Sequence, residues 1–179
     1  MKKQNNLDNL ALAAMFLALA YVMPFLTGQI PQIGAMLCPM HIPVIICGFV
    51  CGAPWGLIVG FVAPLLRSLT WGTPPLFPAA VAMAFELAAY GFICAILYRT
   101  FPKKNGYIYC SLIIAMITGR LVWGAVQFAC MGFDVTKFGF AAFWAGAVTN
   151  AFPGIILQIV IIPIIVILLK KVNLINKRL

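Results

Sequence analysis

Residues 153–169 have the sequence PGIILQIVIIPIIVILL, in which Gln158 is the only strongly polar side chain. A helix needs about 20 predominantly apolar residues to cross the hydrocarbon core of a bilayer. The surrounding residues extend this apolar stretch, and we therefore expect a membrane-spanning helix over about 141–170. It is long enough to tilt, and it carries Pro153 and Pro163.

The rest of the chain has the same composition. Of its 179 residues, 64% are hydrophobic and 8% are charged, against roughly 45–50% and about 25% in an ordinary soluble domain. The mean hydropathy is +1.08. A soluble fold of this size has too little interior to hide so much apolar surface, and the composition also excludes disordered, collagen-like and nucleic-acid-binding proteins. We therefore expect an integral membrane protein.

Proline, glycine and polar clusters divide the chain into apolar segments. The second and third segments are short, which membrane proteins tolerate where helices pack on one another. No internal repeat, linker or soluble segment is evident, so we expect a single membrane domain over 1–179, an all-α bundle of six transmembrane helices. The predicted helices cover about 8–26, 41–52, 55–71, 78–99, 107–131 and 141–170.

Basic residues orient this bundle. Cytoplasmic ends of membrane helices are enriched in lysine and arginine, and an even number of helices with both termini in the cytoplasm leaves Lys137 as the single basic residue in the outer loops. The first apolar segment lacks a small-residue cleavage pattern, which favours a retained helix over a signal peptide. The residues on the cytoplasmic side are then Lys2, Lys3, Arg99, Lys103, Lys104, Lys170, Lys171, Lys177 and Arg178.

Six cysteines are scattered along the chain, mostly within apolar runs. None forms a CxxC pair, and the sequence has one histidine, so we interpret the cysteines as small buried hydrophobic side chains rather than metal ligands or disulfides. We expect no metal and no cofactor. The cysteines are Cys38, Cys47, Cys51, Cys94, Cys110 and Cys130.

Five polar residues from five different predicted helices are candidates for a binding site. Glu86 and Arg120 fall inside helices, Arg67 lies near the outer end of one, and His41 opens another. A charge at the centre of a membrane helix costs at least a few kcal/mol. Counting along the helices places these four residues and Asn150 at or outside the midplane. We expect a polar pocket that opens outward.

The balance of charge suggests what this pocket binds. Two arginines against the carboxylate of Glu86 leave a positive charge in excess, which favours an anionic ligand group held by a guanidinium. The alternative is an internal ion pair between Glu86 and either arginine. Arg120, Trp123 and Gln127 share one helix face and form a candidate wall. Gln127 also suits hydrogen bonding between helices, and His41 also suits an interfacial or capping role.

The first predicted helix has a different pattern. Ala11, Ala14 and Ala18 form one stripe, which we expect to face away from the polar pocket. Ala14 and Ala18 have the small-xxx-small spacing that lets another helix approach closely.

These residues together resemble the substrate-binding S component of an energy-coupling-factor (ECF) vitamin transporter. The similarity covers nearly the whole chain, and it includes six helices in fewer than 200 residues and a long outer loop after the first helix. The stretches that carry it are PMHIPV at 39–44, PLLRS at 64–68, PPLFP at 74–78, FELAAYG at 85–91, GR at 119–120 and PGIILQ at 153–158.

The resemblance implies a multi-pass protein of a prokaryotic plasma membrane that binds a vitamin-like molecule, pantothenate being the best candidate. It also implies a transmembrane coupling subunit, contacted by Ala14 and Ala18, and two cytoplasmic ATPases that supply the energy. The chain itself has no GxxxxGK[ST] phosphate-binding loop.

Two other classes of function compete with that of an S component. An intramembrane enzyme needs a serine–histidine pair, paired carboxylates or a metal-binding set, and three acidic residues with one histidine supply none of these. A stand-alone proton-coupled transporter needs only one titrating carboxylate in the membrane, and Glu86 suits that role.

Overall fold

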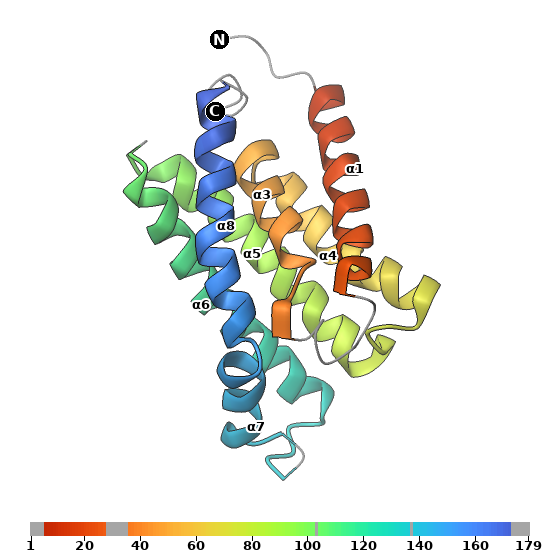
Figure 1. Ribbon diagram of the computed structural model, residues 1–179. Helices are drawn as coiled ribbons and strands as arrows, with labels where there is room; N and C mark the ends of the chain where they lie inside the picture. Colours follow the sequence, from red (N-terminus) through yellow and green to blue (C-terminus); the bar gives the residue numbers. More distant parts are fainter. Residues whose placement is uncertain (1–5, 28–35, 103, 137, 173–179) are drawn as a thin grey trace.

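The computed structural model in Figure 1 describes residues 6–27, 36–102, 104–136 and 138–172. These residues form helices and turns and contain no strand, which confirms the all-α class. The elements are α1 (Asn6–Val22), the 3-10 helix η1 (Met23–Thr27), α3 (His41–Cys51), α4 (Ala53–Trp71), the π-helical turn η2 (Leu76–Ala80), α5 (Val81–Thr100), α6 (Gly106–Cys130), α7 (Phe140–Trp144), the π-helical turn η3 (Ala145–Thr149) and α8 (Phe152–Lys171).

Five helical segments among the described residues are long and apolar enough to cross a membrane. They cover Leu7–Phe25, Ala53–Trp71, Leu76–Thr100, Gly106–Cys130 and Phe152–Lys171. The helix α3 has 11 residues and is therefore only about 16 Å long, too short to cross alone. The structure thus agrees with a multi-pass membrane protein but does not confirm six full spans.

The last predicted helix is wrong as a single element over 141–170. The structure divides it at Asn150 and Ala151 into a short segment, α7 with η3, and the long helix α8. Pro153 lies in the first turn of α8, where a proline fits, but its ring would clash with the preceding turn of a continuous helix. Within η3 the backbone relaxes to a wider turn, in which the amide of Asn150 donates to the carbonyl of Ala145.

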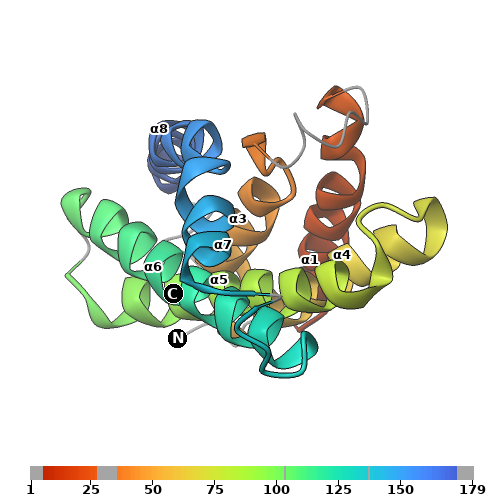
Figure 2. The same ribbon diagram turned by 90° about the horizontal axis from the view of Figure 1, so that it is seen from below.

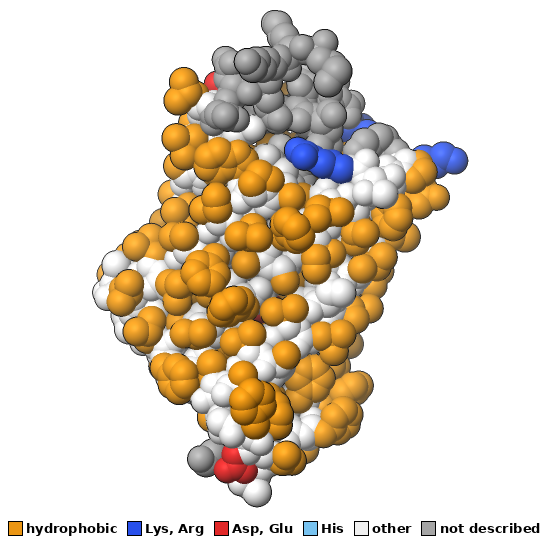
Figure 3. Space-filling model, turned by 180° about the vertical axis from the view of Figure 1, so that it is seen from behind, with side chains coloured by type: hydrophobic (Ala, Val, Ile, Leu, Met, Phe, Trp, Pro, Cys, Tyr) orange, Lys and Arg blue, Asp and Glu red, His pale blue; other side chains and the backbone are white. Residues whose placement is uncertain are grey.

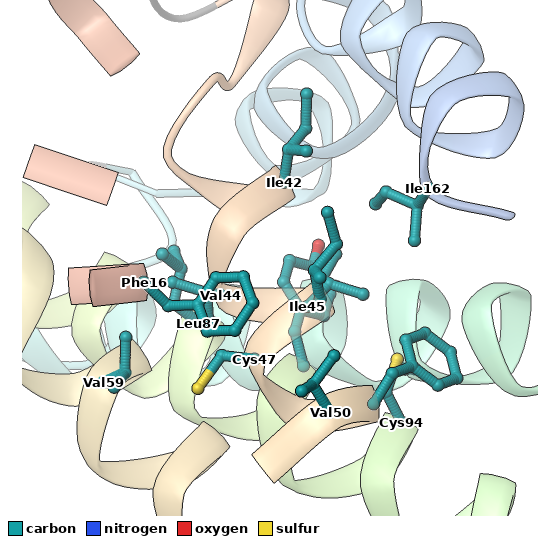
Figure 4. Close-up of a cluster of buried hydrophobic side chains, with 14 of the residues drawn as sticks. Phe16, Ile42, Val44, Ile45, Cys47, Val50, Val59, Leu87, Cys94 and Ile162 are labelled. Atoms are coloured by element: carbon teal, nitrogen blue, oxygen red, sulfur yellow. The ribbon is translucent and has the colours of Figure 1, made fainter. Parts of the chain in front are cut away.

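The helix α3 lies at the centre of the bundle. It has α1 on one side and α8 on the other in two perpendicular views (Figures 1 and 2), and it also packs on α4 and α5. All of its residues are buried. Figure 4 shows its side chains Val44 and Ile45 in the core, among residues that include Phe16, Leu87 and Ile162. This position fixes the start of α3, and therefore His41, inside the bundle.

Glycines allow α3, α4 and α5 to pack in backbone contact. A Cβ atom at Gly48 would collide with the backbone of Gly91, and one at Gly91 would collide with the backbone of Gly56. Small residues of this kind permit close helix packing within membranes. The close approach brings the first residues of α3 next to α5, which carries Glu86.

The two ends of the bundle differ in charge. The start of α1 and the end of α8 lie at the same end of the molecule (Figure 1). Described basic side chains gather near this end together with the acidic Asp8 of α1, an acidic side chain lies at the opposite end, and exposed hydrophobic side chains cover the surface between them (Figure 3). The basic residues are Arg99, Lys104, Lys170 and Lys171. The distribution is the one expected of a bilayer protein with its basic end in the cytoplasm.

The helix α1 has one buried face and one exposed face. Ala13, Phe16 and Ala20 are buried against the bundle, whereas Ala11, Ala14 and Ala18 are exposed. The predicted alanine stripe is therefore on the outer surface of the bundle, away from the core.

Candidate functional site

A buried cluster of polar side chains surrounds the carboxylate of Glu86. Glu86 lies on α5 and is 1% exposed. Its Oε1 atom forms an ion pair with Arg120 Nη1 at 2.9 Å and accepts a hydrogen bond from the Tyr90 hydroxyl at 2.8 Å. Tyr90 is four residues after Glu86, so the two side chains share one face of α5. The predicted alternative of an internal Arg–Glu pair is therefore what the structure contains, with Arg120 as the partner.

His41 approaches the same carboxylate oxygen from α3. Its Nε2 atom lies 3.6 Å from Glu86 Oε1, which is longer than a normal hydrogen bond. The imidazole is 1% exposed, and neither of its ring nitrogens has a hydrogen-bond partner among the described residues. Glu86 thus lies between a permanent cation and a side chain that becomes a cation when protonated.

Arg120 connects this cluster to a cavity between α6 and α8. The cavity has a volume of about 270 Å³, and among the residues that the structure describes Arg120 is the only charged one that lines it. The Arg120 side chain is 15% exposed, against 2% for Glu86. The apolar lining residues are Ile113, Met116, Ile117, Leu121, Phe143, Ala147, Val148, Ile155 and Ile159. Arg120 thus lies at the boundary between the buried charged cluster and an apolar cavity.

Cys38 contacts the other terminal nitrogen of the Arg120 guanidinium. Its Sγ atom lies 3.7 Å from Arg120 Nη2. Burial raises the pKa of the Cys38 thiol, so the neutral thiol faces the guanidinium and Glu86 carries the balancing charge. Two nitrogens of the Arg120 guanidinium are therefore engaged within the protein, and the Arg120 side chain remains 15% exposed.

Arg67 does not join this cluster, although the sequence placed it in the same pocket. It lies near the C-terminal end of α4, where its Nη1 atom donates to the Tyr21 carbonyl at 3.2 Å and its guanidinium carbon lies 5.2 Å from the centre of the Phe25 ring. The Tyr21 hydroxyl also donates to Thr70 and accepts from the indole of Trp71. Arg67 therefore holds the end of α1 against α4.

The remaining predicted site residues, Trp123, Gln127 and Asn150, do not line the cavity. Trp123 packs on the rings of Phe138 and Phe143, with centroid distances of 5.7 and 6.3 Å, and thereby supports the cavity wall. Gln127 has a buried Oε1 atom without a partner among the described residues. Asn150 is exposed at the break between η3 and α8 and does not line the cavity.

Sequence reasoning missed two residues that touch the charged cluster. Tyr90 had a usable signal, because a residue four positions after a buried glutamate shares its helix face. Cys38 had none, because it lies in the loop before α3 and reaches Arg120 only through the tertiary fold. The apolar wall from α8 was also missed, since Ile155 and Ile159 do not differ from their neighbours in sequence.

A family model described as "ECF transporter, substrate-specific component" matches residues 8–166 of this chain. The match covers all the predicted site residues and the alanine stripe. No curated protein and no solved structure matches the chain.

Proposed function

Since the chain belongs to the family of substrate-specific components of ECF transporters, we propose that it binds its substrate in the cavity beside Arg120. In this proposal the substrate enters from the outer side, and partner subunits drive its import with ATP. The family match makes the chain a subunit of a transporter rather than an enzyme. The observation that carries the site is the presence of Arg120, the one charged side chain among the described residues that line this apolar cavity.

The depth of the cluster supports binding from the outer side. Glu86 is five residues from the start of α5 at Val81, which is about 8 Å along the helix. Arg99, near the other end of α5, belongs to the basic end of the bundle. The positive-inside rule makes that end cytoplasmic, so the cluster lies in the outer half of the membrane.

For the substrate itself we propose a small vitamin-like carboxylate, with pantothenate as the first candidate. Its carboxylate suits the guanidinium of Arg120, and its compact dimethyl centre suits the isoleucines of α6 and α8. The cavity of about 270 Å³ is near the lower limit of small-molecule pockets, which range over about 300–1,000 Å³.

For coupling we propose that the exposed stripe of Ala11, Ala14 and Ala18 contacts the transmembrane coupling subunit. Small side chains allow another helix to approach closely, and the stripe faces away from the core. Substrate binding and energy coupling then use different surfaces of one chain. Two ATPase subunits in the cytoplasm complete the proposed importer.

Thermal unfolding of the purified chain with a vitamin panel tests the binding proposal. The panel contains pantothenate, nicotinate, biotin and lipoate, together with uncharged and cationic vitamins. A compound present at a hundred times its dissociation constant should stabilise the folded chain by about 2.7 kcal/mol. We expect one carboxylate to do so. Stabilisation by an uncharged or cationic vitamin alone would keep the transport role but reject the carboxylate.

A further inference from the structure

The charges in the cluster balance only while the cavity holds no additional charge. The guanidinium of Arg120 and the carboxylate of Glu86 cancel, and His41 adds nothing while it is neutral. An anion placed against Arg120 would share this cation with Glu86, which leaves one uncompensated negative charge. Burying such a charge in a low-dielectric interior is costly.

The structure holds a second group able to balance that charge. His41 does not line the cavity, and its Nε2 atom lies 3.6 Å from the carboxylate oxygen that Arg120 also contacts. A protonated His41 would compensate Glu86 and leave Arg120 to the ligand. Histidine is the side chain that most readily changes charge near neutral pH.

We propose that the site beside Arg120 takes up a monoanion together with one proton, and that His41 holds the proton. This inference rests on the proposed function. The ligand class is then a small organic anion of charge −1 with an apolar body. A dianion would leave a charge unbalanced, and a neutral molecule would not need the proton. The proton comes from solvent and returns there when the anion leaves.

The titratable surroundings of His41 leave few other places for the proton. Glu86 and Tyr90 face it from α5, Arg120 from α6, and Cys38 precedes it in the chain. The helices α1, α4 and α8 also pack on α3. Among their titratable groups, the Arg67 guanidinium donates to the backbone carbonyl of Tyr21 and the Tyr21 hydroxyl donates to Thr70. Lys170 donates to Asn105, and Asp8 and Lys171 are exposed.

Titration calorimetry in two buffers of different ionisation enthalpy measures the protons taken up. The probes are pantothenate, nicotinate, biotin and lipoate, each paired with its neutral counterpart panthenol, nicotinamide, biotinamide or lipoamide. We expect a carboxylate to bind, its neutral counterpart to bind at least tenfold more weakly, and about one proton to enter per anion. If one proton enters with each anion, the dissociation constant should rise as the pH rises, by up to tenfold per pH unit.

Two variants identify the group that takes the proton. His41→Gln should bind the same carboxylate more weakly and without proton uptake. Glu86→Gln should bind it with no proton uptake and with little dependence on pH, because Arg120 and the anion then balance alone. Asp134→Asn removes a carboxylate outside the cluster and should keep the wild-type proton uptake.

Several results would overturn the inference. In the binding measurements, these results are failure of all four carboxylates to bind, or binding of a neutral counterpart as tight as that of its carboxylate. In the proton measurements, they are absence of proton uptake in the wild-type chain, or unchanged proton uptake in His41→Gln or Glu86→Gln. Binding of an uncharged or cationic vitamin with no carboxylate bound would reject the anion and its proton but leave the proposed transport function intact.

Discussion

Replacing Arg120 by methionine is expected to remove substrate binding and to weaken the fold at the same time. Loss of a buried charge that pairs with a ligand typically costs about 2–5 kcal/mol, which is about thirtyfold to several thousandfold in the dissociation constant. Glu86 would also lose its cation while it stays buried, and breaking such a pair lowers the free energy of unfolding by about 3–5 kcal/mol. Calorimetry and thermal unfolding measure the two effects separately.

Two further variants separate binding from folding. In the double variant Arg120→Met with Glu86→Gln no buried charge is left unpaired, so stability should largely return while binding stays lost. Arg67→Gln is the matched control, because this buried arginine holds Tyr21 and does not line the cavity. Its affinity for the same carboxylate should change less than threefold. An equal loss of affinity in Arg67→Gln and Arg120→Met would place both arginines in the site.

Replacing Ala14 or Ala18 by tryptophan is expected to abolish ATP-dependent uptake by the assembled transporter. Both alanines are exposed on α1, and a bulky side chain there would prevent close approach of a partner helix. The isolated chain should keep its wild-type affinity, because the stripe does not line the cavity. Uptake in cells that hold the whole complex and binding to the purified chain are the two measurements.

Ala129→Trp supplies the control for this prediction. Ala129 is an exposed alanine on a different membrane helix, α6, so its replacement adds the same bulk to another surface. We expect it to reduce uptake far less than either α1 variant. If Ala14→Trp and Ala18→Trp lost binding together with uptake, the stripe would belong to the bundle interior, and unimpaired uptake would remove it from the coupling surface.

Hydrophobic patterning predicted much of the helical framework but not the break in its last segment. The predicted helix over 107–131 agrees with α6 to within one residue at each end, because the loop before it contains proline, glycine and charged residues that end helices. The apolar residues around Asn150 gave no comparable signal. The sequence alone does not distinguish a proline at a helix start from a proline inside a helix. Pro153 lies in the first turn of α8, whereas Pro163 lies inside it.

The position of a residue along its helix was predictable from the sequence, but its direction around the helix axis was less so. Counting residues placed His41, Glu86 and Arg120 in the outer half, and the structure brings these three together. The same counting placed Arg67 beside them, whereas the packing of α1 on α4 turns it toward Tyr21. Which face of a short apolar helix turns inward depends on all its neighbours, and α4 is apolar on several sides.

The most direct test of the account is uptake of radiolabelled pantothenate, and of any panel compound that stabilises the chain, into proteoliposomes. The chain is reconstituted alone or with a coupling subunit and two ATPases, and either ATP or a pH gradient is supplied. We predict accumulation only in the complete complex with ATP. Accumulation by the chain alone in response to the pH gradient would contradict the account and identify a stand-alone proton-coupled transporter that uses Glu86.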